Sequence, residues 1–204
     1  MKKTLQTIIE EAYKQWQTAI VANHIPTINE RTIQVYLAYY LLQYGKPIAE
    51  KAGYDFHVLL EKDMGEINAC KINGHARCDI VVGLSEGEKE CRAAIEMKRP
   101  EMKKNAKNAA TTDARFAVLC DIEVLEQYKA DLKYEIAYTD YHVFPHSRED
   151  VKFNISQGKE VPKEKEYIKK GKTCTVNIKG KYVSKWDELP ISNPQHYFLK
   201  LNVK

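Results

Sequence analysis

The fold prediction for this chain rests on Ala76-Arg-Cys-Asp-Ile-Val-Val-Gly83, followed by Cys91-Arg-Ala-Ala-Ile-Glu-Met-Lys98. Both segments are short, mostly apolar and bounded by polar residues, which is typical of strands that are buried on both faces. Side chains alternate between the two faces of a strand, so Glu96 and Lys98 share one face while their neighbours point into a core. We therefore expect two strands, joined by a polar turn, that direct Asp79, Glu96 and Lys98 toward one place.

Two carboxylates and an ammonium in one place predict a metal-dependent hydrolase site. Ionised Asp79 and Glu96 repel each other, and a shared Mg²⁺, for which Mn²⁺ substitutes, removes the repulsion while it binds waters and a substrate phosphate. Lys98 beside this metal would hold or deprotonate the attacking water and offset charge on the phosphate. A second interpretation is a solvated charge pattern on the open face of a sheet. The apolar surroundings favour the metal site, because a buried carboxylate without a partner is costly.

The order of Asp79, sixteen intervening residues and then Glu96-Met97-Lys98 resembles the PD-(D/E)xK nuclease superfamily, which includes restriction endonucleases and nucleases of DNA repair and recombination. Cys78 occupies the proline position of the motif, and the resemblance covers roughly residues 25–145. It implies an α/β fold with a restriction endonuclease-like core, a mixed central sheet flanked by helices. It also implies a Mg²⁺-dependent DNA endonuclease of restriction, defence, recombination or repair type, without an organic cofactor. Asp79 and Glu96 would bind the metal with the carbonyl of Met97, and Lys98 would activate the water.

Two further acidic residues are candidates for the metal shell. The resemblance places an acidic residue on the helix before the sheet, and Glu30 matches that position. Thr27-Ile-Asn-Glu30 is also a capping box, in which Glu30 would only accept a backbone hydrogen bond at the helix start. Glu61 ends the first predicted strand, where several nucleases of the resembling superfamily carry a supporting metal ligand. Its alternative is a surface ion pair with Lys62 or a neighbouring lysine.

Apolar periodicity predicts the other elements of the core. Residues 4–22 and 28–44 show helical spacing, and residues 54–61 and 134–138 show the pattern of strands. Asn73-Gly74 predicts a hairpin turn before the Asp79 strand. Residues 104–130 are interpreted as the helix that connects two parallel strands, although the apolar run 116–120 is also compatible with a buried strand.

The C-terminal quarter differs in composition from the rest. Residues 151–204 contain 12 lysines and five acidic residues, a net charge of +7 that leaves −3 for residues 1–150. We expect a nuclease-like core over 1–150 and a small, basic, β-rich subdomain over 151–204, with a hairpin that turns at Lys179-Gly180. This subdomain would contact nucleic acid or form a homodimer, which an enzyme that cuts both DNA strands needs. Lys103, Lys104 and Lys107 follow the catalytic strand and are candidate contacts to backbone phosphates, although a solvated helix face explains them equally well.

Composition also bounds the setting of the protein. No run of about 18 apolar residues exists, and residues 1–11 turn acidic where a signal peptide needs an apolar stretch, so we expect a cytoplasmic protein without a membrane partner. The five cysteines lack a C-x-x-C pair and lie mostly in apolar segments, which predicts buried free thiols. His142 and His146 lack companion ligands, so a zinc site is not expected.

Two other functions fit the same residues. One is a nucleic-acid-binding or protein-interaction module that keeps the fold without cutting. The other is a metal-dependent hydrolase of a small phosphate ester, which needs a closed pocket and no basic track. The intact set of Asp79, Glu96 and Lys98 argues against the first, and the charge of the C-terminal region argues against the second.

Overall fold

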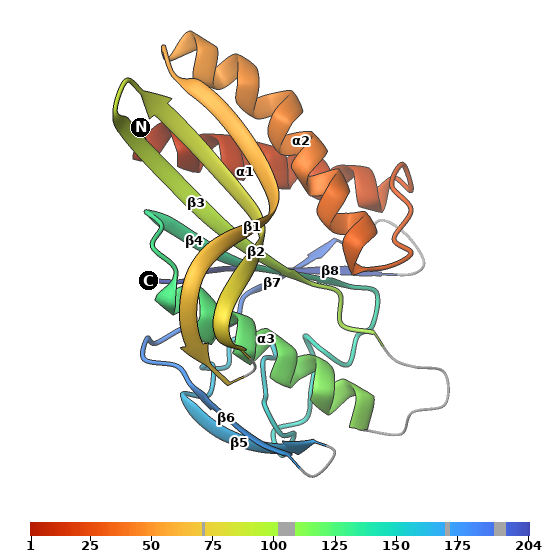
Figure 1. The fold of residues 1–204 in the computed structure, drawn as a ribbon. Coiled ribbons are helices and arrows are strands. Elements are labelled where there is room, and N and C mark those ends of the chain that lie inside the picture. The colour runs from red at the N-terminus through yellow and green to blue at the C-terminus, as the bar shows by residue number, and fades with distance from the viewer. Residues whose placement is uncertain (71, 102–108, 170–171, 190–194) are drawn as a thin grey trace.

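A mixed sheet lies between two helices on one face and one helix on the other (Figure 1). The computed structural model describes residues 1–70, 72–101, 109–169, 172–189 and 195–204. In this part of the chain the sheet order is β1-β2-β3-β4-β8-β7. The predicted α/β architecture, a mixed sheet flanked by helices, is confirmed at this level. None of the described helices is long and apolar enough to cross a membrane.

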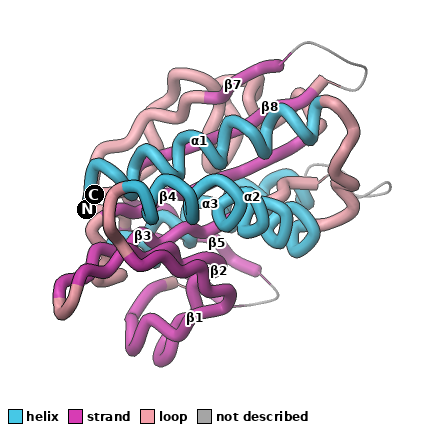
Figure 2. The backbone as a smooth tube through the Cα atoms, turned by 90° about the horizontal axis from the view of Figure 1, so that it is seen from above, coloured by secondary structure: helices cyan, strands magenta, loops and turns pink. Residues whose placement is uncertain are grey.

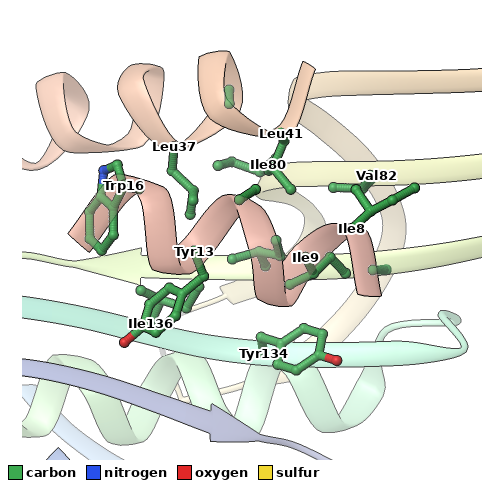
Figure 3. Close-up of a cluster of buried hydrophobic side chains, with 14 of the residues drawn as sticks. Ile8, Ile9, Tyr13, Trp16, Leu37, Leu41, Ile80, Val82, Tyr134 and Ile136 are labelled. Atoms are coloured by element: carbon green, nitrogen blue, oxygen red, sulfur yellow. The ribbon is translucent and has the colours of Figure 1, made fainter. Parts of the chain in front are cut away.

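Helices α1 (Lys2–Val21) and α2 (Glu30–Lys51) cover one face of the sheet. Their apolar side chains interlock with those of the strands below, as Figure 3 shows around Trp16 and Leu37. Trp16 is fully buried, and its Nε1 donates a hydrogen bond to the carbonyl of Ile33 at 3.1 Å. Both predicted helices are confirmed, and α2 continues through Pro47 beyond its predicted end.

Strands β1 (Asp55–Ala69) and β2 (Ile72–Glu86) form a long antiparallel hairpin, which joins β3 (Lys89–Lys98). The predicted turn at Asn73-Gly74 is wrong, because the ladder extends to the pair Ala69–Ile72. Gly74 instead lies inside β2 with a φ of 127°, a conformation that glycine adopts without strain. The Asn-Gly signal therefore marks an irregular position in the strand and not its end.

Helix α3 (Ala109–Gln127) covers the other face of the sheet and leads to β4 (Leu132–Thr139), which pairs with β3 in parallel. The run 116–120 is helical, so the connection between parallel strands was predicted correctly. Its apolar side chains pack beneath β2, β3 and β4 with those of the C-terminal region. The sheet thus separates two cores, one beneath α1 and α2 and the other beneath α3.

Strands that follow residue 150 divide between two sheets. β5 (Glu164–Lys169) pairs with β6 (Lys172–Asn177), while β7 (Trp186–Leu189) pairs with β8 (His196–Asn202), which joins β4 in the main sheet. Figure 2 shows β7 and β1 at opposite edges of the main sheet. The domain boundary at residue 150 stays a prediction.

The predicted hairpin turn at Lys179-Gly180 is wrong. The partner of β6 is the preceding strand, and the backbone N–H groups of Lys179 and Gly180 donate instead to the carboxylate of Glu126 on α3, at 2.8 and 2.7 Å. Tyr182 adds its hydroxyl to the same carboxylate at 2.8 Å. One acidic side chain on α3 therefore fixes this loop, which a local turn signal does not reveal.

The expectation of free thiols alone is also wrong, because Cys70 and Cys174 form a disulfide with Cα atoms 5.4 Å apart. It joins the end of the β1–β2 hairpin to β6, across 104 residues of sequence. Sequence spacing gave no sign of this pairing, which depends on the fold bringing two distant hairpins together. Cys78, Cys91 and Cys120 are buried free thiols, as predicted.

The disulfide predicts a thiol count. Protein purified without reductant and then denatured should present three reactive thiols, and five after reduction. Cys174→Ser should present four in both states, because Cys70 loses its partner. A count of five in unreduced wild-type protein would contradict the disulfide. Quantitative alkylation followed by mass spectrometry measures these numbers directly.

Candidate functional site

Three acidic side chains lie in a row across β2, β3 and β4. Ile80 pairs with Ile95, so Asp79 and Glu96 follow at the next step of both strands, and Glu96 pairs with Glu135 on β4. The residues two positions away from this row point to the same face and pack in the core beneath α3: Val81, Ala94 and Ala137. The predicted parity is therefore correct, and the sheet brings Asp79 and Glu96 together with a carboxyl group that sequence reasoning missed.

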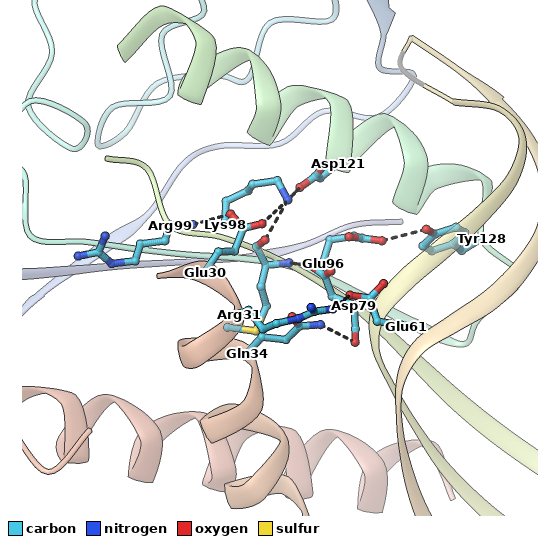
Figure 4. Close-up of polar contacts among 11 residues, drawn as sticks. Glu30, Arg31, Gln34, Glu61, Asp79, Glu96, Lys98, Arg99, Asp121 and Tyr128 are labelled. Carbon is cyan, nitrogen blue, oxygen red and sulfur yellow. Dashed lines mark hydrogen bonds and ion pairs between the residues drawn. The ribbon is translucent and has the colours of Figure 1, made fainter. Parts of the chain in front are cut away.

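Asp79 is fixed by two hydrogen bonds (Figure 4). Its Oδ2 accepts from the backbone N–H of Met97 at 2.8 Å, and its backbone carbonyl accepts from Nε2 of Gln34 on α2 at 2.9 Å. Burial raises the pKa of Asp79 to about 6, against the opposing effects of Lys98 and of the Met97 N–H. The ionised form is thus disfavoured here unless more positive charge arrives.

Glu96 is more deeply buried, at 6% exposure. Its Oε1 accepts a hydrogen bond from the hydroxyl of Tyr128 on α3 at 2.9 Å. Burial raises the pKa of Glu96 well above its usual range, and the nearby carboxylates of Asp121 and Asp79 raise it further. Two neighbouring carboxyl groups that both resist ionisation form a site in which a cation would be strongly stabilised.

Lys98 lies in the centre of the charged groups. Its Nζ is 2.8 Å from Asp121 on α3 and 3.2 Å from Glu30 on α2, and it donates to the carbonyl of Met97 at 3.0 Å. Burial alone would lower the pKa of Lys98, but Asp121, Glu30 and Glu135 together raise it above its usual value. Lys98 is therefore an ammonium at neutral pH, held by carboxylates from two helices on opposite faces of the sheet.

Glu30 contacts the site and does not form the predicted capping box. Asn29 is the N-cap of α2, and its side chain accepts from the N–H of Thr32 at 2.8 Å. One oxygen of Glu30 pairs with Lys98, and the other accepts from the N–H of Arg99 at 3.1 Å. The capping alternative is excluded, and a role as metal ligand stays a prediction.

Glu61 pairs with a surface arginine, whereas Glu30 pairs with Lys98 in the site. It adopts a left-handed backbone conformation with φ of 52°, and its side chain is 41% exposed. Its carboxylate pairs with Arg31 at 3.4 Å, where the sequence suggested Lys62 or another lysine as the surface alternative. Among the described residues, no three histidine, cysteine or carboxylate side chains form a group that could enclose a metal ion.

Asp121 and Glu135 are the site residues that sequence reasoning missed. Asp121 lies in the middle of an apolar stretch of α3, and Glu135 stands between two buried residues of β4. Glu135 is fully buried, and neither of its carboxyl oxygens has a hydrogen-bond partner among the described residues. Burial, reinforced by Asp121, raises the pKa of Glu135 well above its usual value, so the uncharged form is favoured. A charged residue inside an otherwise apolar segment was the available signal for both.

The remaining predicted contacts have mixed outcomes. Lys103, Lys104 and Lys107 lie outside the described residues. His142 and His146 stack on each other with ring centroids 4.2 Å apart, and His146 pairs with Glu188. Comparison with known proteins adds no identification. No family model, curated protein or solved structure matches this chain.

Proposed function

We propose that this protein is a metal-dependent nuclease of the PD-(D/E)xK type, with a restriction endonuclease-like core and DNA as its substrate. One observation carries the proposal. Asp79 and Glu96 occupy opposed positions on neighbouring strands, and the Lys98 ammonium lies on the same face beside them. A mixed sheet flanked by helices agrees with the fold that this motif implies.

The donor set fits Mg²⁺. This ion is usually held by one or two carboxylates and completes its shell with waters and substrate phosphates, so Asp79 and Glu96 suffice without a third side chain. Both have a raised pKa, from burial and from nearby carboxylates, and a divalent cation would remove that cost. The carbonyl of Met97 already faces Nζ of Lys98 and is suited to a third ligand position. When bound, Mg²⁺ would activate water and neutralise charge on the phosphate.

The protein's own groups then have separate roles. Asp79 and Glu96 would hold the metal, and Tyr128 orients Glu96 through its hydroxyl. Lys98, an ammonium in the metal-free protein, would orient the attacking water and stabilise the charge that grows on the phosphate oxygens.

A cleavage assay tests the proposal. Supercoiled plasmid, linear duplex, single-stranded DNA and single-stranded RNA are incubated with the protein and Mg²⁺, Mn²⁺ or EDTA. Wild type should cut in Mg²⁺ and Mn²⁺ and not in EDTA. Asp79→Asn should lose at least about a hundredfold in rate, because a neutral amide binds the metal poorly and does not offset its charge. The preferred substrate separates endonuclease from exonuclease and DNA from RNA.

Asp55→Asn is the matched control, because it neutralises an exposed carboxylate of β1 away from the site. It should cut like wild type. If folded wild type binds DNA but cuts none of these substrates in either metal, the non-cleaving binding module replaces the nuclease. Hydrolysis of a small phosphate ester without polynucleotide cleavage would instead favour the phosphatase alternative.

A further inference from the structure

A polar cavity lies at the start of α3, away from the row of carboxyl groups. Its volume is about 510 Å³, and it is lined by the first turns of α3 and by the segment 143–152 that follows β4. Polar side chains supply most of the lining: Thr111, Thr112, Arg115, His146, Ser147, Arg148, Asp150 and Lys152. None of these residues belongs to the site described above.

Arg115 is the unusual member of this lining. It is only 1% exposed, yet it has no carboxylate partner among the described residues. Its Nη2 donates to the carbonyl of Val143 at 2.9 Å and to Oγ of Ser147 at 2.8 Å, and its guanidinium lies over the ring of Phe144 at 5.4 Å. Its Nε is buried without a hydrogen-bond partner in the described chain. A buried cation without a counterion is costly, and an anion in the cavity would remove that cost.

The charged side chains that line the cavity leave a net positive charge. Arg148 pairs with Asp150 at 3.2 Å, and His146 lies against Glu188, so these groups already have acidic partners. Arg115 and Lys152 remain as positive charges without an ion pair among the described residues. The cavity also borders the first turn of α3, where the helix dipole favours an anion.

We propose that this cavity binds a phosphate group, with Arg115 as its buried anchor and Lys152 at its mouth. A planar guanidinium that is already oriented by Val143 and Ser147 suits the tetrahedral oxygens of phosphate.

The position of the cavity suggests the source of the phosphate. Arg115 precedes Asp121 by six residues on α3, which is about 9 Å along the helix axis. That length is within a few phosphates along one strand of bound DNA. The ligand is then a backbone phosphate of the bound polynucleotide, a few nucleotides from the bond that Lys98 faces. This assignment of the source rests on the proposed nuclease function, whereas the phosphate site itself does not.

Calorimetric titration with inorganic phosphate, without metal and at low ionic strength, tests the site itself. Wild type should bind one phosphate per chain, and Arg115→Met should weaken binding about tenfold or more, because a charged hydrogen-bonding partner is lost. Arg115→Met risks misfolding, so the exposed Lys152→Gln provides a second variant, with an expected loss of about threefold. Lys14→Gln, on the exposed face of α1, is the matched control and should bind like wild type.

A second arm distinguishes the sources of phosphate. Binding of a duplex oligonucleotide to wild type, Lys152→Gln and Lys14→Gln is measured in Ca²⁺ with the same proteins. Parallel loss of phosphate and oligonucleotide affinity in Lys152→Gln assigns a backbone phosphate. Loss of inorganic phosphate alone assigns a free phosphate or phosphomonoester. Absence of phosphate binding by wild type, or equal binding by all variants, overturns the site. Because neither arm measures cleavage, this result is independent of a failed nuclease assay.

Discussion

Replacing Lys98 by methionine should lower the rate of metal-dependent cleavage by about 10²- to 10³-fold at saturating substrate. Lys98 Nζ lies 2.8 Å from Asp121 and 3.2 Å from Glu30, so the structure holds its ammonium in the acidic site. Without it, the bound metal alone would have to offset the negative charge that develops on the phosphate. The loss should appear in kcat more than in KM, because the ammonium acts mainly on the transition state.

Two comparisons separate this role from a structural one. Asp121→Asn keeps the shape of the contact and removes a charge that raises the pKa of Lys98, so the alkaline limit of activity should move to lower pH while a smaller part of the rate is lost. Lys200→Met, at a half-buried position over the ring of Tyr13 and away from the site, should leave the rate unchanged. A folded Lys98→Met protein that cuts at the wild-type rate would remove Lys98 from the mechanism. Melting curves of all variants show whether they are folded.

The part of the site that sequence predicted is the part that local geometry determines. Strand parity places Glu96 and Lys98 on one face, and the next strand of a hairpin brings Asp79 opposite Glu96. Asp121 and Glu135 come from elements whose position depends on how α3 and β4 pack against the sheet. Their register is not determined by spacing along the chain, although a carboxyl group inside an apolar segment was a usable signal.

The wrong predictions have a similar origin. A turn signal describes a few residues, and a distant group that satisfies the same backbone can override it. Glu126 accepts the N–H groups of Lys179 and Gly180, so the signal there marks a loop bound to α3. At the start of α2 the N-cap is Asn29 and not Thr27, which leaves the Glu30 carboxylate available to Lys98.

Asp79→Asn should also stabilise the metal-free protein at neutral and alkaline pH. The pKa of Asp79 is about 6 in the folded protein, above its ordinary value of 3.8, because burial disfavours the charged form. A raised pKa means that the folded state binds the proton more tightly than the unfolded chain. The resulting stabilisation is complete below about pH 4 and is lost as the pH rises through 6. The difference between the two pKa values corresponds to roughly 3 kcal/mol of folding stability, which wild type loses as Asp79 ionises. Asparagine stays neutral, so the variant keeps this stability at high pH.

Urea unfolding at pH 4, 6 and 8 in EDTA measures this effect. The free energy of unfolding of Asp79→Asn minus that of wild type should rise with pH by up to about 3 kcal/mol, whereas Asp55→Asn should show no such rise. Mg²⁺ should reduce the difference at pH 8, because a cation stabilises the ionised Asp79 of wild type and does little for asparagine. A difference that is flat with pH would show that Asp79 is not desolvated as the structure places it. A rise that Mg²⁺ leaves unchanged would separate the buried carboxylate from metal binding and argue against Asp79 as a ligand.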